Sequence, residues 1–447
     1  MGSLIVKFWD YIEKKWESPY AIILLSVIIV AVELWLLPMV KLEQYNLMHI
    51  IIICISLLSL HFLWWYSTKK LPKCPKEKVG ILIAINPENN DDKEVLENDF
   101  IANMITESSV NDDLKIIVLP LKFSQKINNH KTAYDFCIKT KSSLIILGGV
   151  KNRKIKNQDV RVFRLNMTLL GPLAENPEII DQASSIMPLK MNIPKCDELQ
   201  YLEITARWLY LAVKYYIALG LCLSKNFDAA EKHMCDLNKK ITSIANLDKR
   251  LSLLQHLNKY TLISVYEILG IKAYSSWKKC NNKNDLFEMK RCIKQIQLLD
   301  KNTSYRCRLL FSIYLFIDGR QINNALSVLQ SCSGNSDDAT WKYNIAFLYA
   351  YIGNLTKSYS FYKKAFSLKI SQPNILELEE FIVNVVNQET EKYQLYFCLG
   401  IISYYVKKDN LSTVKYLTNF IDQGCGNLKF KKQIELSQKI INEAKSK

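Results

Sequence analysis

The stretch WKYNIAFLYAYIGNLTKSYSFYKKAFSLK, from Trp341 to Lys369, decides the fold of the C-terminal half of the chain. Apolar and aromatic residues recur in it at helical spacing, before and after the pair Gly353-Asn354. A glycine beside an asparagine marks a turn. The stretch therefore predicts two helices that are joined by a short turn and pack against each other.

Small and bulky residues stand in this stretch where two packed helices need them. Close approach of two helices requires small side chains, and an inserting neighbour requires bulky ones. The stretch closely resembles a tetratricopeptide repeat, whose large-small pair, aromatic position and second-helix packing positions correspond to Ile345, Ala346, Tyr349, Ser358, Tyr362 and Ala365. The resemblance implies that the stretch is one unit of a helical solenoid.

Further copies of the unit lie elsewhere in the C-terminal half. Ala325 stands about one repeat length of 34 residues before Ser358. Other units are YYIALGLCLSKNFDAAEKHM (215–234), Leu269 to Ile296 and Leu399 to Ile421. About four or five such pairs are sufficient for a stack, because each repeat buries its apolar face only against neighbours. We expect a solenoid of TPR-like repeats over 197–447, capped by a polar helix from Lys429 to Ala444.

The first helix of the clearest repeat carries the candidate partner-binding residues. If the copy is in register, Tyr343, Asn344, Phe347 and Tyr351 line the concave side, where such solenoids take an extended peptide or a helix of a protein partner. The alternative is that this stripe packs against the neighbouring repeat. Asn344 matches an asparagine with which some family members clamp a peptide carboxylate, but the accompanying lysine and asparagine pattern is absent from the preceding repeat.

Two apolar runs near the N-terminus predict a transmembrane helical hairpin over 21–66. The first, 21–40, contains one charge, Glu33, and the second, 47–66, contains none. Each run is long enough to cross about 30 Å of hydrocarbon as a helix. The connection between them is too short for a folded exterior domain. The alternative is a buried pair of helices in a soluble domain.

Flanking charges and aromatic residues predict the orientation of this hairpin. Lysines precede the first run within residues 1–20 and follow the second run within a basic linker, 67–78, where Lys69, Lys70 and Lys73 are expected to face anionic lipid. Trp16, Tyr20, Trp64, Trp65 and Tyr66 fit an aromatic belt on the same side. We expect a multi-pass protein of the inner (cell) membrane with both termini in the cytoplasm.

Glu33 is the membrane residue with the strongest functional signal. An ionisable group within a span is a functional candidate, with His49 or His61 as its partner. The alternative is that Glu33, one turn from Pro38, extends to the outer interface.

A small α/β domain follows over 79–172. Short β-branched runs alternate with helical stretches and end in a strictly alternating strand, which predicts parallel strands closed by an antiparallel hairpin. The runs VGILIAI, LKIIVLP, SLIILGGV and DVRVFRLNM give an order that resembles the TolB-like amino-terminal domain. The resemblance implies a non-enzymatic binding or assembly module. Residues 173–196, with Gly171-Pro172 before them, are expected to be a linker.

No pattern predicts an enzyme, a cofactor or a metal site. The turn after Ile85 lacks the glycines of nucleotide-binding loops. The acids Glu88, Asp91, Asp92 and Glu94 fit the first turn of a helix better than a cation site. Five histidines and twelve cysteines occur without metal-ligand spacing or a CxxC pair.

The sequence thus predicts a membrane-anchored, non-catalytic scaffold or sensor that recruits a protein through its repeats. The main alternative is a ligand- or partner-gated effector of a bacterial defence system that disrupts the membrane, with the hairpins forming a homo-oligomer. A third hypothesis, nucleic-acid binding, rests only on the net charge of +16 and the basic tip Lys151, Arg153, Lys154 and Lys156, and is disfavoured.

Overall fold

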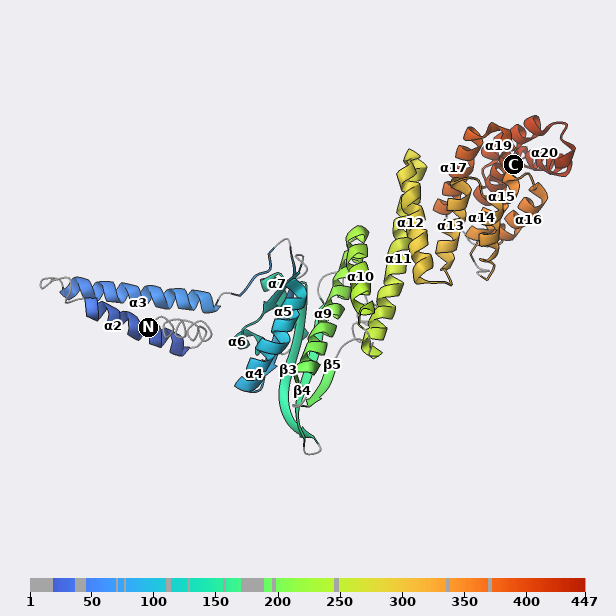
Figure 1. Ribbon diagram of the computed structural model, residues 1–447. Coiled ribbons are helices and arrows are strands. Elements are labelled where there is room, and N and C mark those ends of the chain that lie inside the picture. Colours follow the sequence, from blue (N-terminus) through green and yellow to red (C-terminus); the bar gives the residue numbers. More distant parts are fainter. Residues whose placement is uncertain are drawn as a thin grey trace. The chain divides into compact units, whose positions relative to one another are not determined.

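The computed structural model describes residues 19–36, 46–69, 71–75, 78–109, 114–127, 129–155, 158–169, 189–194, 198–244, 249–334, 338–368 and 372–446. The chain divides into two compact units, Met1–Val213 and Lys214–Lys447. The fold is α plus β, with a small mixed sheet in the first unit and a stack of helices in the second (Figure 1).

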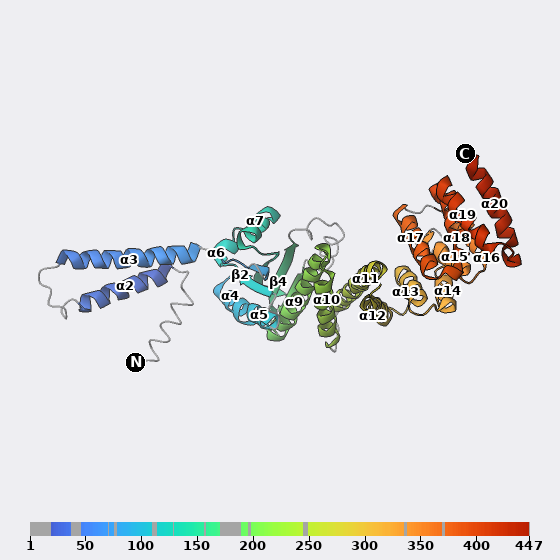
Figure 2. The same cartoon turned by 90° about the horizontal axis from the view of Figure 1, so that it is seen from above.

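The first two helices among the described residues are α2 (Pro19–Leu36) and α3 (Asn46–Lys69), which lie side by side in both views (Figures 1 and 2). Their surfaces are apolar and largely exposed, with Val27, Ile55, Leu58, Phe62 and Leu63 each more than half exposed. The connection between the two helices, where the turn of the hairpin is expected, lies outside the described residues.

The described parts of α2 and α3 do not meet the length and composition expected of a membrane-spanning helix. Among the described residues, one helical stretch passes that test, Tyr201–Leu223, and 72% of its apolar window is buried within the structure. The apolar parts of α2 and α3 that the structure describes, Tyr20–Glu33 and Ile51–Tyr66, are shorter. The multi-pass membrane hairpin therefore stays a prediction.

The sheet has five strands in the order β2-β1-β3-β4-β5. Strand β1 pairs in parallel with β2 and β3, and β4 is antiparallel to β3 and β5. The bounds are β1 (Val79–Pro87), β2 (Leu114–Val118), β3 (Leu144–Ile155), β4 (Gln158–Leu169) and β5 (Leu189–Pro194). The parallel strands and the closing hairpin are confirmed.

One expectation about this domain is wrong, because the stretch assigned to a linker, 173–196, contains β5. This strand pairs with β4 from Val160↔Pro194 to Leu165↔Leu189. Its sequence LKMNIP alternates apolar and polar residues, which is the pattern of a strand with one buried face. Strand β5 completes the antiparallel part of the sheet.

Helices cover the two faces of the sheet (Figure 2). On one face, α4 (Asn90–Val95), a π-helical turn (Leu96–Ile101) and α5 (Ala102–Ser109) bring Phe100 against Phe163, with ring centroids 6.1 Å apart. On the other face, Ala133 and Cys137 of α7 (His130–Thr140) pack against apolar side chains of the strands, such as Leu82 and Ile145. The short helix α6 (Leu121–Ser124) contacts β1. Leu71 and Cys74, expected in the basic linker, pack into the α7 face.

The second unit is built from consecutive helices, most of which pair with the next along the chain. Their bounds are α9 (Glu198–Leu223, which begins in the first unit), α10 (Phe227–Thr242), α11 (Lys249–Cys280), α12 (Lys283–Leu299), α13 (Tyr305–Ile317), α14 (Ile322–Gln330), α15 (Thr340–Tyr351), α16 (Leu355–Phe366), α17 (Gln372–Gln388), α18 (Leu395–Ile402), α19 (Asn410–Gly424) and α20 (Lys431–Lys445).

The stretch from which the repeats were predicted folds as expected into α15 and α16. Gly353 between them has φ +75°, a left-handed conformation that favours glycine, and the side chain of Asn354 caps α16 by accepting from the Lys357 amide. The small residues Ala346, Ser358 and Ala365 are fully buried. The stack is compatible with a helical repeat.

Candidate functional site

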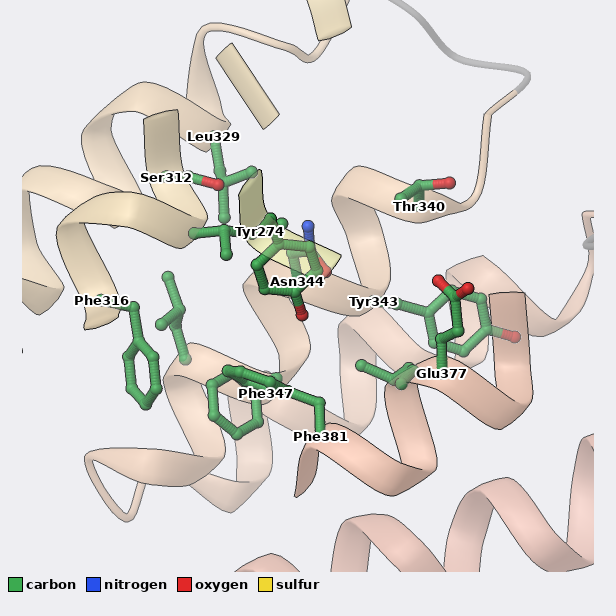
Figure 3. A pocket seen from close by; sticks show the side chains of 13 residues that line it. Tyr274, Ser312, Phe316, Leu329, Thr340, Tyr343, Asn344, Phe347, Glu377 and Phe381 are labelled. Atoms are coloured by element: carbon green, nitrogen blue, oxygen red, sulfur yellow. The ribbon is translucent and has the colours of Figure 1, made fainter. Parts of the chain in front are cut away.

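A cavity of about 230 Å³ opens in the second unit, lined from alternate helices of the stack (Figure 3). Most of its wall comes from α11, α13, α15 and α17, with Leu329 from α14. Its lining consists of Tyr274, Ser312, Ile313, Phe316, Leu329, Thr340, Tyr343, Asn344, Phe347, Leu348, Glu377, Leu378 and Phe381. We call this cavity and the two that adjoin it the groove.

Three phenylalanines form the apolar floor of the groove (Figure 3). Phe316 and Phe347 have ring centroids 5.0 Å apart, and Phe381 lies 5.8 Å from the first and 5.4 Å from the second, all edge to face. Phe316 and Phe347 are almost fully buried. Because mutual packing holds these rings, the floor is a preformed apolar surface.

Polar groups stand above this floor. Asn344 and Thr340 of α15 are half-buried, and Glu377 of α17 is exposed and is the only formally charged residue in the lining. Burial raises the pKa of Tyr274, and the carboxylates of Glu377 and Glu380 raise it further. Ionisation of this phenol is thus disfavoured, and the tyrosine stays a neutral hydrogen-bonding group.

Two neighbouring cavities extend the groove. One, of about 720 Å³, shares Tyr274, Thr340, Asn344 and Glu377 with the first and adds Arg306 among others. The other, of about 50 Å³, shares Phe316 and Phe381 and reaches Trp277, Lys278 and Arg320. The groove is therefore longer than a single side chain and suits an extended or helical segment.

Charged groups at the narrow end of the groove are already paired. Arg320 donates to Glu389 from Nε at 2.9 Å and from Nη2 at 2.6 Å, and its guanidinium lies 4.3 Å from the Phe316 ring centroid. Lys278 pairs with Glu380. The Glu389 carboxyl is partly desolvated, which raises its pKa, but hydrogen bonds from Tyr351 and Arg320 outweigh this and leave the pKa lowered. These pairs connect α11 and the turn between α13 and α14 to α17 and the residue that follows it.

The four predicted partner-binding residues divide into two groups. Tyr343, Asn344 and Phe347 all line the groove. Of these, Tyr343 is 1% exposed, and its ring packs on Tyr362 and Phe366 of α16. Tyr351 is absent from the lining, is 7% exposed and donates its hydroxyl to Glu389 at 2.5 Å. Tyr343 and Tyr351 therefore pack within the stack, which is the alternative expectation for this stripe.

Sequence reasoning missed Tyr274, Phe316, Phe381 and Glu377. The first two lie in helices that were included in weaker units, and the last two lie in α17, which no recognised unit covered. A helical apolar stripe was visible at each position, but helical periodicity alone does not distinguish a groove from a core.

The structure describes only part of the membrane-related candidates. Glu33 is half-buried, and its Oε2 is buried without a hydrogen-bond partner among the described residues. The His61 ring contacts the Leu57 carbonyl at 2.9 Å, and the His49 side chain is not described. Lys73 is exposed, whereas the Lys69 side chain and Lys70 lie outside the described residues.

The acidic turn after β1 contains one buried ion pair, whereas Glu88, Asp91 and Glu94 are exposed. Asp92 is fully buried; its Oδ1 lies 2.8 Å from Arg161 Nε and accepts from Asn152 Nδ2 at 2.9 Å. The helix-capping interpretation is confirmed for this turn, since Asn89 accepts from the Asp92 amide at 2.8 Å. The pair ties α4 to the β3–β4 hairpin.

Groups suited to metal binding or nucleophilic attack are scarce in the described part of the chain. No cluster of three or more histidine, cysteine or acidic side chains is found there. Burial raises the pKa of Cys137, Cys292, Cys307 and Cys398 to about 12, which keeps these thiols protonated.

Comparison with known proteins adds no relative. No protein-family model matches the chain, and no curated protein is similar to it. What defines the chain is therefore its fold and groove: an α plus β protein whose helical stack carries a preformed groove with an apolar floor.

Proposed function

We propose that this protein is a membrane-anchored, non-catalytic scaffold or sensor that recruits a protein partner through the groove. The observation that carries the proposal is the phenylalanine floor beneath Asn344, Thr340 and Glu377, which combines apolar and polar contacts as recognition surfaces do. In this view the helical pairs are TPR-like units, and the sheet domain is a TolB-like assembly module.

The anchor in this proposal is the pair α2 and α3, placed in the membrane with both ends of the hairpin on the cytoplasmic side. At 1.5 Å per residue the helices extend about 27 and about 36 Å, close to the thickness of the hydrocarbon layer. Their exposed apolar side chains favour lipid over water. Anionic headgroups would attract the lysines that follow α3, including Lys73.

The recruitment step is tested by filling the groove. Asn344→Trp adds a large side chain at a half-buried position of the lining without removing a core contact. We expect it to abolish partners captured by crosslinking from intact membranes. Ser360→Trp on the exposed side of α16 is the matched control and should leave capture unchanged. Equal capture by both variants would refute recruitment through the groove.

A second candidate is the membrane-disrupting effector, and Glu33 is the observation that favours it. A carboxylate oxygen buried in an apolar helix pair is costly, and intramembrane acids commonly serve ion pathways or assembly. The effector predicts membrane depolarisation in expressing cells, abolished by Glu33→Leu. If the membrane potential stays intact under every condition in which a partner is captured, the effector hypothesis is refuted and the scaffold hypothesis remains.

A further inference from the structure

The cavity above the phenylalanine floor has an unbalanced charge that indicates the chemistry of the partner. Lys278 and Arg320 are paired with Glu380 and Glu389, so their charges are compensated within the stack. Glu377 has no ion pair among the described residues and stands beside the apolar floor. A free carboxylate is distinctive here because the chain as a whole carries +16.

Other charged residues also line the groove, but Glu377 is the one beside the apolar floor. Asp338, which lines the larger cavity, accepts from the Thr340 amide at 2.7 Å just before α15. Arg306 lines the larger cavity but not the one above the phenylalanines. Burial raises the pKa of Tyr274, and the nearby carboxylates of Glu377 and Glu380 raise it further.

The size of the cavity limits what enters it. An engineered apolar cavity of about 150 Å³ accommodates benzene. The cavity above the floor measures about 230 Å³, so it has room for one aliphatic or aromatic side chain. Its apolar floor excludes a charged group there, because desolvating an unpaired charge is unfavourable.

We propose that the groove binds a basic, apolar peptide segment of a partner protein. One bulky apolar side chain lies on Phe316, Phe347 and Phe381, and a neighbouring lysine or arginine of the peptide pairs with Glu377. The inference rests on recruitment through the groove and specifies the partner. An acidic segment is rejected, because its carboxylates meet Glu377 beside a low-dielectric wall where repulsion is poorly screened.

Selection from a random dodecapeptide phage library tests this chemistry, with the full-length chain in lipid nanodiscs as the bait. We expect peptides that carry a lysine or arginine next to a leucine, isoleucine or aromatic residue. Enrichment of acidic peptides, or of peptides with no charge preference, would overturn the inference while leaving the groove a binding site.

Charge variants of Glu377 give the quantitative test with one enriched peptide, measured by fluorescence anisotropy. Glu377→Gln should weaken binding about fivefold, as loss of a partly exposed ion pair does. Glu377→Lys should weaken it further, and a peptide with glutamate in place of its lysine should restore binding to that variant. Glu391→Gln, an exposed acid outside the groove lining, is the control and should bind like the unaltered chain.

The outcomes separate this inference from the proposed function. Peptides that bind the unaltered chain and lose binding on Asn344→Trp, but are indifferent to Glu377→Lys, contradict the charge assignment alone. Enriched peptides that bind the Asn344→Trp chain equally well contradict recruitment through the groove, and with it the inference. Restoration by the charge-reversed peptide supports both.

Discussion

In the described part of each unit, an ion pair involves a fully buried charged side chain. Asp92 and Arg161 lie between α4 and the β3–β4 hairpin, and Lys214 of α9, with a side chain 1% exposed, pairs with Asp236 of α10. Burial removes hydration from Asp92, Arg161 and Lys214, so each of these three charges depends on its partner, whereas Asp236 is 41% exposed. Such pairs contribute little net stability but specify which elements meet.

Asp92→Ala tests this dependence at the level of the residue. The variant leaves the Arg161 guanidinium buried without its carboxylate, and we expect local destabilisation of about 3 kcal/mol or more. Hydrogen exchange of the β3 and β4 amides measures the opening free energy of this region in the full chain. Glu88→Ala is the control: its pair with Lys151 is half exposed, so the loss should stay below about 1 kcal/mol. Equal protection in both variants would show that the buried pair contributes nothing.

Glycine allows neighbouring elements of this chain to approach closely, because it has no side chain. In strand β3, a Cβ on Gly148 would lie 2.5 Å from the Arg164 carbonyl oxygen of β4, whereas a Cβ on Gly149 would meet its nearest atom, the Asn86 carbonyl oxygen, at 3.6 Å. The first position therefore requires glycine for the pairing of β3 with β4, and the second does not.

A comparison of two adjacent alanine variants tests this difference at the level of the element. Gly148→Ala should destabilise the β3–β4 hairpin by about 1 to 3 kcal/mol, because backbone must shift to admit the methyl group. Gly149→Ala should be neutral or slightly stabilising, since alanine restricts the unfolded chain. Amide exchange of β3 and β4 is again the measurement. A larger loss of protection for Gly149→Ala would contradict the close approach.

At the scale of the whole molecule, the apolar surface of α2 and α3 is the feature that a soluble chain would not be expected to expose. Ile55 is 58% exposed and Leu58 is 69% exposed, and both lie on a helix without charges over Ile51–Tyr66. Contiguous exposed apolar surface indicates contact with a membrane or a partner. The proposed anchor follows from this surface.

The double variant Ile55→Asp with Leu58→Asp tests anchoring. Each acid near the centre of a span costs about 3 kcal/mol, so we expect the chain to move from the membrane pellet to the supernatant in an alkaline carbonate wash. The control is Phe287→Asp on α12, which alters a side chain that is 70% exposed outside the hairpin. Release of the unaltered chain by the wash would refute the anchor itself.

Sequence alone determined many of the elements, though not β5, because strands and helices follow from local periodicity. Alternation in residues 160–167 predicted β4, and Gly353-Asn354 placed the turn between α15 and α16. It also found three groove residues, Tyr343, Asn344 and Phe347, from their place in a TPR-like sequence pattern.

Tertiary structure decided which residues form the groove and which are core. Tyr343 and Asn344 are neighbours in sequence, yet one is buried on Tyr362 and the other faces the cavity. Tyr274 and Phe381 join them from helices far apart in sequence. The physical reason is that a helical stripe specifies an apolar face but not its neighbour, and only the packing of successive helices leaves part of that face uncovered.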